Sequence, residues 1–373
     1  MKVEFFRHNI GPKEIAKVTE VLHSIFLTTG DVVYEFEENF SQYLGCKYTI
    51  GVNSGTAALH LSLLAYDVGK GDEVITTPMS FIATANSILH AGGKPIFVDV
   101  EPETGNINAE LIEQALTDET KAILPVHLYG QMCDMKKIKK VADQYNLIII
   151  EDAAHCIEAE REGINPAQLS EAACFSFYAT KNITSGEGGA ISTNNKEIAE
   201  KLKQLRLHGM SKEATERYTK KYEHYDMELL GWKYNMDNIQ AALLLNQIGL
   251  IEERLKRREE ICKMYEEGFS KFEGIDFPKV LPKSKSARHL FTIWVDPQRR
   301  DEIMWKLQKR GIGVAVNFYA IHLMKYYRKN FGYKRGMFPI TEKIEDSTIS
   351  LPLYPKLTDA QVAYVIEKVR EVV

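Results

Sequence analysis

Short apolar runs alternate with amphipathic segments of helical spacing between about residues 45 and 195. Strands that alternate with helices are joined by crossover connections, which predicts a largely parallel sheet covered on both faces. The expected strands are continuous apolar runs, as buried parallel strands are. They span Tyr48–Val52, Glu73–Thr76, Lys94–Val98, Ala122–Val126, Leu147–Ile150, Ala173–Ser176 and Gly189–Thr193, with helices expected at Thr56–Tyr66, Ile82–His90, Ala109–Leu116 and Met135–Tyr145.

The pattern changes after Asn235. From Met236 to Phe272, apolar residues recur at helical spacing without a proline, which predicts a bridging helix of roughly 50 Å. Gly249 and Gly268 leave room for bends in it. The remaining chain predicts strand, helix, strand and closing helix at 288–295, 302–310, 313–316 and 358–372.

We therefore expect an α/β protein of two domains. The large α/β domain would span residues 13–248 and contain a mostly parallel seven-stranded sheet. The small C-terminal α+β domain would span residues 249–373, with residues 1–12 packed against it. The alternative organisation is one large α/β domain.

Charge and cysteine content argue against several classes of protein. A net charge of −4 gives no basic surface for nucleic acid. The N-terminus lacks a signal-peptide core and no apolar run is long enough to span a bilayer, so a cytoplasmic protein is expected. Five cysteines without a Cys-x-x-Cys pair argue against a disulfide framework and a thiolate metal site. Cys156 and Cys174 are interpreted as reduced core residues.

The first stretch that suggests chemistry is Asn53–Leu59, which follows a strand and opens a helix. Small residues there let backbone N–H groups and a hydroxyl converge on an anion at the positive helix terminus. The alternative is that Ser54 or Thr56 only caps the helix. The stretch has neither the ending of a Walker loop nor a GxGxxG fingerprint.

The second stretch is Ile150–His155, an apolar strand that ends in acidic residues. Open α/β folds bind ligands at the carboxyl ends of their strands, so Asp152 is expected at the binding edge. Two alanines follow it and leave space for a ring, and a buried carboxylate is expensive without a cationic partner. The alternatives are a strand-end cap for Asp152 and a core histidine for His155.

The third stretch runs from Cys174 through Lys181 into the glycine-rich turn 184–190. Desolvation between buried segments lowers the pKa of a lysine, as a Schiff-base nucleophile requires. The alternative is a lysine that extends from a loop to solvent. Together the three stretches supply a phosphate cradle, an aspartate for a pyridine nitrogen and a lysine for an aldehyde, which pyridoxal phosphate needs.

The chain resembles the DegT/DnrJ/EryC1/StrS aminotransferases, nucleotide-sugar enzymes of the aspartate aminotransferase-like fold type I, nearly end to end. The resemblance rests on the three stretches and on further motifs. These are TPMSFIATAN (77–86), PVHLYGQ (125–131), LHGM (207–210), GWKYNM (231–236), FYAIH (318–322) and SLPLYP (350–355).

The resemblance implies a role for each matching residue around pyridoxal 5′-phosphate. Lys181 would hold the cofactor as a Schiff base and catalyse proton transfer, and Asp152 would keep the pyridine nitrogen protonated. Phe81 would stack on the ring and His155 would lie near its hydroxyl. Gly55, Thr56 and Ser176 would hold the phosphate, and Asn235 would reach the cofactor phosphate of the neighbouring subunit in a homodimer. His322 and Tyr319 would contact the nucleotide sugar, although the alternative for Tyr319 is a packing aromatic.

Within the family, residues 207–212, Arg217-Tyr218 and 322–328 look closest to the UDP-sugar 4-aminotransferases. This implies a ping-pong transfer from L-glutamate to a UDP-linked 4-keto sugar. His322, Lys325 and Arg328 would supply the cations for its diphosphate, although a solvated basic helix face is the alternative. Glu158 stands where many relatives carry glycine, and Met324-Lys325 replaces a common Gln-Pro pair, so the sugar pocket is expected to differ.

Rival classes stay open at this point. One is another fold-type-I enzyme, such as a lyase or a cysteine desulfurase. Such enzymes typically supply an arginine for the donor carboxylate, and the sequence does not identify one. A nicotinamide dehydrogenase is disfavoured by the missing glycine fingerprint. A non-catalytic binding protein is disfavoured because Lys181 and Asp152 are both present.

Overall fold

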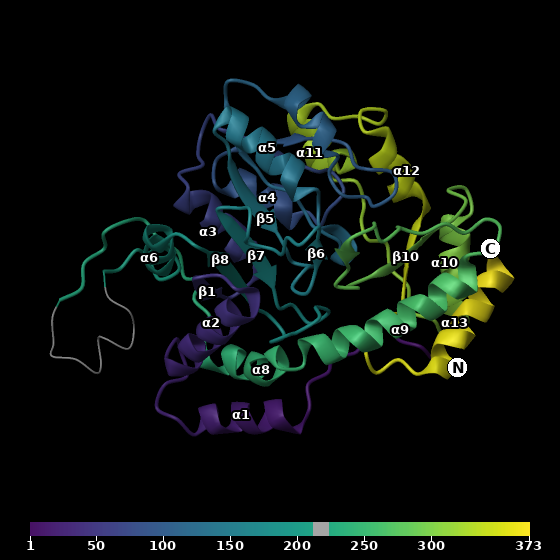
Figure 1. Ribbon diagram of the computed structural model, residues 1–373, viewed down its shortest axis with the longest axis horizontal. Helices are drawn as coiled ribbons and strands as arrows, with labels where there is room; N and C mark the ends of the chain where they lie inside the picture. The colour runs from purple at the N-terminus through teal and green to yellow at the C-terminus, as the bar shows by residue number, and fades with distance from the viewer. Residues whose placement is uncertain (212–223) are drawn as a thin grey trace.

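Seven strands form the central sheet of the computed structural model, which describes residues 1–211 and 224–373 (Figure 1). The strand order is β1-β8-β7-β5-β4-β2-β3, and only the pairs made by β8 are antiparallel. The predicted mostly parallel seven-stranded sheet is confirmed. Its strands are β1 (Tyr48–Val52), β2 (Glu73–Thr76), β3 (Lys94–Phe97), β4 (Thr120–Ile123), β5 (Ile148–Asp152), β7 (Ala172–Ser176) and β8 (Gly189–Thr193).

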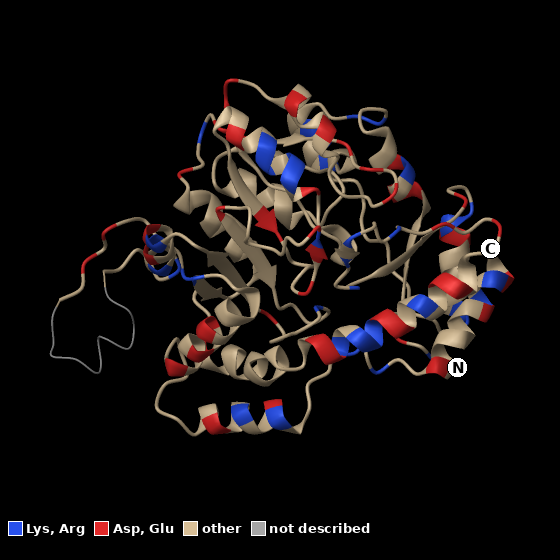
Figure 2. Cartoon of the chain, in the orientation of Figure 1, with Lys and Arg blue, Asp and Glu red and all other residues tan. Residues whose placement is uncertain are grey.

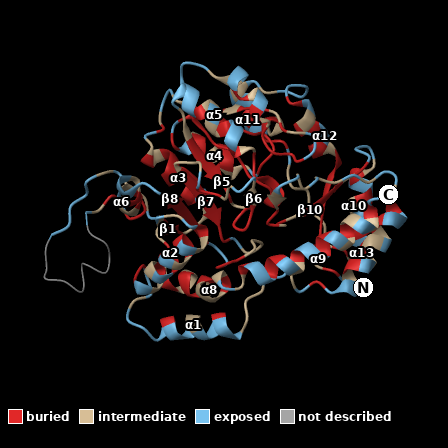
Figure 3. Cartoon of the chain, viewed as in Figure 1, coloured by how far each residue is buried: buried red, intermediate tan, exposed pale blue. Residues whose placement is uncertain are grey.

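Helices cover both faces of this sheet. Successive residues of a strand point to opposite faces, so each face carries apolar side chains that pack against helices. On one face, Cys174 and Ile191 pack against α3 and α6. On the other, Phe175 and Ala190 pack against α2 and α8, while Ile149 packs against α5. The strands are accordingly buried (Figure 3). The helices are α2 (Asp31–Leu44), α3 (Gly55–Ala65), α5 (Met135–Tyr145), α6 (Lys196–Leu205) and α8 (Asn238–Ile248).

A second apolar cluster lies around the strands β10 (Phe291–Trp294) and β11 (Thr348–Leu351), which pair antiparallel. It contains side chains of α9 (Ile251–Phe269), α10 (Arg300–Lys309) and α13 (Asp359–Val372). The chain's N-terminus packs here as well. The N–H of Val3 donates to the Gly311 carbonyl at 2.8 Å, and the carbonyl of Val3 accepts from the Gly313 N–H at 2.8 Å.

Shorter elements complete the described part of the chain. They are the helices α1 (Pro12–Leu22), α4 (Ala83–His90), α11 (Lys325–Phe331) and α12 (Pro339–Ser347), the paired strands β6 (Glu160–Arg161) and β9 (Ser284–Lys285), and 3₁₀ turns at Ala109–Leu111, Glu113–Ala115, Leu128–Gly130 and Ile321–Leu323.

Three local expectations were wrong. The helix expected over 236–272 is two helices, α8 and α9, which meet at Gly249-Leu250. The helix expected over 109–116 is two 3₁₀ turns, the first of which begins where Asn108 Oδ1 accepts the Glu110 N–H at 3.0 Å. The strand expected at 313–316 makes only one bridge, between Ala315 and Ser350, because Gly313 lies against the N-terminal segment instead.

On the surface of the molecule, lysines and arginines alternate with glutamates along α9 (Figure 2). Among the described helices, none is long and apolar enough to cross a membrane. All five cysteines are free, and four of them, including Cys156 and Cys174, are buried as expected.

Candidate active site

A cavity of about 580 Å³ lies at the carboxyl ends of the central strands. Asp152 ends β5, Ser176 ends β7, and Ser54 follows β1 at the start of α3. This is the edge where open α/β sheets bind ligands. The opposite wall comes from the N-terminus and from the part of the chain after α9, through Phe5, Phe6, His289, Leu290, Asn317, Phe318, Leu351 and Leu353.

The start of α3 forms one end of the cavity. Ser54 is the helix cap, because its hydroxyl accepts the Ala57 N–H at 3.1 Å, so the capping interpretation holds for this residue. Gly55 and Ser176 approach so closely that a Cβ on Gly55 would lie 2.8 Å from the Ser176 Cβ. A Cβ on Gly189 would lie 2.4 Å from the Ser54 carbonyl. Small residues thus bring backbone and hydroxyl groups together at a positive helix end, as phosphate binding requires.

Asp152 is buried, and its carboxylate accepts two hydrogen bonds. Its Oδ2 accepts from the Thr84 hydroxyl at 2.8 Å and its Oδ1 from the Ala154 N–H at 3.2 Å. Burial raises the pKa of Asp152, and these two bonds oppose the rise. Within residues 1–211 and 224–373 no ion pair forms at this carboxylate. A cationic ring nitrogen would supply the missing charge.

Lys181 follows the end of β7 and lines the same cavity. Burial lowers the pKa of Lys181 to about 8, and the nearby charge of Asp152 opposes this shift. An amine with this pKa is partly neutral at physiological pH and can attack an aldehyde. The turn after it is tight, since a Cβ on Gly188 would lie 2.3 Å from Ser185 Oγ.

Aromatic rings line the cavity between these groups. Phe81 is 58% exposed and lies on the cavity wall. The ring of His155 lies 4.3 Å from that of His289 and stacks on Phe318 at 5.8 Å. His155 Nδ1 is buried without a hydrogen-bond partner among the described atoms. Burial lowers the pKa of His155 well below its usual range, so its ring is neutral.

The cavity therefore fits pyridoxal phosphate at each of its functional groups. A helix terminus can bind the phosphate, a buried carboxylate that forms no ion pair with a described residue can bind a pyridinium nitrogen, and a lysine of lowered pKa can bind the aldehyde. Nδ1 of His155, which has no partner among the described atoms, can accept a hydrogen bond from the ring hydroxyl.

The structure does not bring three of the predicted site residues into this cavity. Asn235 donates to Thr29 Oγ1 at 2.8 Å and accepts from Lys233 Nζ at 2.6 Å. Tyr319 is exposed but does not line the cavity. His322 is fully buried, and its Nε2 lies 3.0 Å from Glu342 Oε1. Their roles stay predictions.

The three cations expected to bind the diphosphate, His322, Lys325 and Arg328, do not form one group on the surface. Lys325 and Arg328 are exposed on α11, whereas His322 lies beneath the surface. Burial lowers the pKa of His322, although Glu342 opposes the shift. Lys212, Arg217 and Tyr218, which carried part of the resemblance to UDP-sugar enzymes, lie outside the described residues.

Sequence reasoning missed several cavity residues. Thr84 and Phe318 belong to motifs that were recognised, but no role followed from sequence for either. His289 lies in the strand expected at 288–295, but β10 begins only at Phe291 and nothing in the strand pattern indicates a site residue. Only the fold brings it beside His155.

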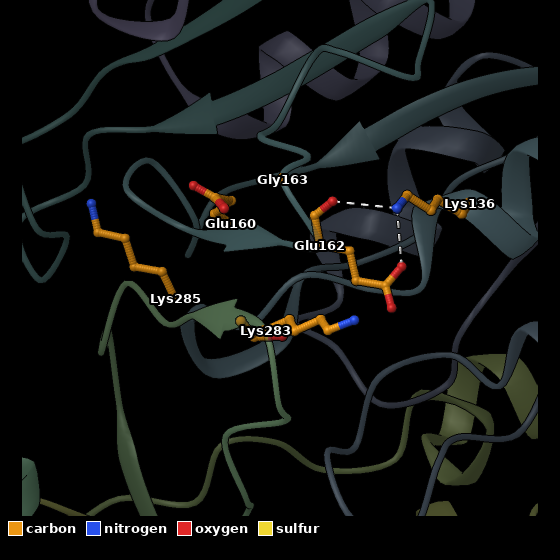
Figure 4. Close-up of a pocket in the computed structure, with 7 residues that line it drawn as sticks. Lys136, Glu160, Glu162, Gly163, Lys283 and Lys285 are labelled. Carbon is orange, nitrogen blue, oxygen red and sulfur yellow. Dashed lines mark hydrogen bonds and ion pairs between the residues drawn. The ribbon is translucent and has the colours of Figure 1, made fainter.

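A second, open pocket of about 550 Å³ lies over β6 and β9 (Figure 4). Its lysines are largely compensated by carboxylates, since Lys136 pairs with Glu162 at 3.2 Å and Lys285 with Glu252 at 2.8 Å. It shares no residue with the cofactor cavity.

The fold and the cavity together define a pyridoxal-phosphate-dependent enzyme of fold type I. A model of the DegT/DnrJ/EryC1/StrS aminotransferase family matches residues 8–370, and the chain belongs to that family. The family therefore identifies the protein as an aminotransferase, in place of the lyase, dehydrogenase and non-catalytic alternatives.

Relatives and a solved structure match nearly the whole length of this chain. The chain is 43% identical to the spore coat polysaccharide biosynthesis protein SpsC of Bacillus subtilis, over 98% of this chain and 95% of the relative. It is 47% identical to an uncharacterized protein of Methanocaldococcus jannaschii, over 99% and 97%. Among solved structures, the PMP form of Spr1654 from Streptococcus pneumoniae, assigned as a sugar aminotransferase, superposes with a TM-score of 0.94 at 31% identity and covers 100% and 99% of the two chains.

Proposed function

We propose that the protein transfers the amino group of L-glutamate to a UDP-linked 4-keto sugar, in a ping-pong reaction with pyridoxal phosphate. The observation that carries this proposal is one cavity that holds a lysine of lowered pKa and a buried aspartate that forms no ion pair within the described residues. Family membership and a relative named for polysaccharide biosynthesis support a sugar acceptor.

Pyridoxal phosphate supplies an aldehyde that takes up the amino group and a ring that withdraws electrons. Lys181 provides the amine that holds this aldehyde. Nζ of Lys181 would take the proton from the donor α-carbon, and in the second half-reaction the same atom would deliver a proton to the carbon of the acceptor that gains the amino group. Because the pKa of Lys181 is about 8, Nζ can both accept and release this proton near neutral pH.

Asp152 keeps the ring nitrogen protonated and so favours electron withdrawal in both half-reactions. Thr84 and the Ala154 N–H hold the carboxylate in place. Gly55, Thr56 and Ser176 bind the phosphate, while Phe81 and His155 contact the ring and its hydroxyl.

The sugar nucleotide is bound at the wall that Phe318 belongs to. A cavity of about 580 Å³ is in the range of small-molecule sites, so it holds the cofactor and the reacting part of a substrate. Tyr319 follows Phe318 directly, and His322 comes four residues after Phe318. We assign both to recognition of the sugar nucleotide, Tyr319 through its exposed ring and His322 through the support that it gives to the segment.

We further propose a homodimer in which Asn235 reaches the partner subunit's cofactor phosphate. Exposed apolar side chains near α1, namely Ile15, Leu22 and Ile25, support an interface on that side of the molecule. Ile25 is 91% exposed, so covering it in an interface would remove apolar surface from water.

The reaction can be tested with purified protein and a panel of keto sugar nucleotides. Glutamate alone should convert the bound cofactor once, which its visible absorption reports, and a UDP-linked 4-keto sugar should reverse the change. Lys181→Ala is the control that should do neither. An enzyme that aminates free 2-keto acids but none of the sugar nucleotides would contradict the acceptor proposal.

A further inference from the structure

A buried ion pair lies behind the cofactor cavity and does not line it. Arg258 Nη2 of α9 donates to Glu158 Oε1 at 2.5 Å, and both side chains are almost fully buried. Arg258 lies between Ile251, in the cluster around the large sheet, and Ile261, in the second cluster. Buried ion pairs add little stability on balance, so a role in positioning other groups is a reasonable hypothesis for this one.

The ion pair orients the amide of Asn182, the residue after Lys181. Asn182 Nδ2 lies 3.0 Å from Glu158 Oε2 and 3.1 Å from the Ala287 carbonyl. Both of these groups can only accept hydrogen bonds, so the NH₂ group of the amide must face them. The amide oxygen of Asn182 therefore faces the other way.

That oxygen determines the tautomer of His289. Asn182 Oδ1 lies 3.1 Å from His289 Nδ1 and can only accept, so Nδ1 must carry the hydrogen. Burial lowers the pKa of His289 well below its usual range, so the ring is neutral. A neutral imidazole with its hydrogen on Nδ1 has a lone pair on Nε2.

The backbone of His289 is fixed independently. A Cβ on Gly130 would lie 2.8 Å from the nitrogens of both Arg288 and His289, so only glycine permits this approach. The N–H of His289 donates to the Tyr129 carbonyl at 3.2 Å. The ring then packs against His155 in the cofactor cavity.

We propose that Arg258, Glu158 and Asn182 form a positioning relay that holds His289 in its Nδ1–H tautomer. His289 Nε2 then serves, beside the orphan Nδ1 of His155, as a hydrogen-bond acceptor for an N–H or O–H group of the cofactor or of the amino donor. The relay rests on the cofactor site of the proposed function. Through the relay, Glu158 would act on the cavity without lining it.

The tautomer can be read directly in the full-length protein labelled with ¹⁵N-histidine, without and with pyridoxal phosphate. Long-range ¹H–¹⁵N correlation distinguishes the two neutral tautomers, and His289→Gln assigns the signal. Asn182→Leu keeps the shape of the side chain and leaves the ion pair intact, but removes the hydrogen bonds to Glu158, to the Ala287 carbonyl and to His289. If the leucine variant does not fold by circular dichroism, Asn182→Ala carries the same test. The control is Asn165→Ala, which removes a bond to the Ala159 carbonyl outside the relay.

We expect a single Nδ1–H tautomer for His289 in the wild type and in Asn165→Ala, and a mixture in Asn182→Leu. The dissociation constant of pyridoxal phosphate should rise about tenfold in Asn182→Leu, in line with one lost hydrogen bond, and stay unchanged in the control. A wild-type Nε2–H tautomer, a protonated ring, or an unchanged spectrum or affinity in the variant would overturn the relay. Absence of cofactor binding by the wild type would instead overturn the proposed function, because the tautomer is read without cofactor as well.

Discussion

The sequence predicted site residues in two regions, the edge of the central sheet and the segment after Phe318. The two regions differ in how closely the fold brings those residues together. At the edge of the central sheet, Asp152, Lys181 and Ser176 converge on one buried cavity. In the segment that follows Phe318, His322 turns inward to Glu342 and leaves the exposed cations of α11 apart from it. The sheet edge is determined by strand order, whereas a loop takes its direction from contacts that arise only in the folded chain.

The largest expected effect belongs to the sheet-edge region. Lys181→Ala removes the amine that moves the proton, and general acid–base catalysis contributes about 10²–10⁴-fold to rates. We expect at least this loss in the single-turnover rate with glutamate, while the other cavity contacts still bind the cofactor. The measurement is rapid-mixing absorbance, with Lys283→Ala as the surface-lysine control. A variant that keeps more than a tenth of the rate would remove Lys181 from the mechanism.

Asp152→Asn should have the next largest effect. The amide fills the same space but cannot balance a cationic ring, so the rate should fall about 10²-fold or more. The conservative control is Thr84→Ser, which keeps the hydroxyl that donates to Asp152. Equal rates in Asp152→Asn and the wild type would show that the carboxylate only caps the strand end.

Most of the sheet edge could be predicted because its residues adjoin strands that the apolar runs identify. Asp152 and Ser176 occupy the last positions of β5 and β7, so their neighbourhood follows from strand order. His289 could not be predicted, because its place depends on the close approach of its backbone to Gly130. The burial of His322 depends on α12, which places Glu342 against it and which the sequence pattern did not reveal.

The pH dependence of cofactor capture should report the environment of Lys181. Burial lowers the pKa of Lys181 to about 8, and only the neutral amine attacks an aldehyde. The capture rate of the protein stripped of cofactor should therefore rise about tenfold per pH unit below 8 and level off above it. Stopped-flow absorbance measures this profile. A rate that keeps rising towards pH 10 would indicate an ordinary solvated lysine.

In the segment after Phe318, we expect a substitution of His322 to lower the stability of the protein as well as its affinity for the sugar nucleotide. His322→Ala leaves the buried carboxylate of Glu342 without one partner, which should cost about 1–3 kcal/mol in the free energy of unfolding. By displacing the segment after Phe318, it should raise KM for the sugar nucleotide more than KM for glutamate. Glu342→Gln is the matched variant and should behave alike. If His322→Ala raises KM without loss of stability, His322 contacts the substrate directly.

The smallest expected effect is that of Asn235→Ala, and an experiment with mixed subunits tests whether Asn235 acts on the cofactor of the partner subunit. Asn235→Ala should weaken cofactor binding by about 1–3 kcal/mol if it removes a buried bond to the phosphate. In a heterodimer with Lys181→Ala, one site would carry both lesions and the other would be intact, so activity should exceed that of either parent. Sedimentation checks the dimer, and a fully active monomer would contradict shared sites.

The central claim is that Lys181 holds the cofactor in the cavity beside Asp152, and borohydride reduction tests it most directly. Purified protein with bound pyridoxal phosphate should absorb visible light, and reduction should abolish that absorption and fix the cofactor irreversibly. Mass spectrometry of the peptides should then find the label on Lys181 alone. A label on another lysine, or no covalent cofactor at all, would contradict the assignment of the site.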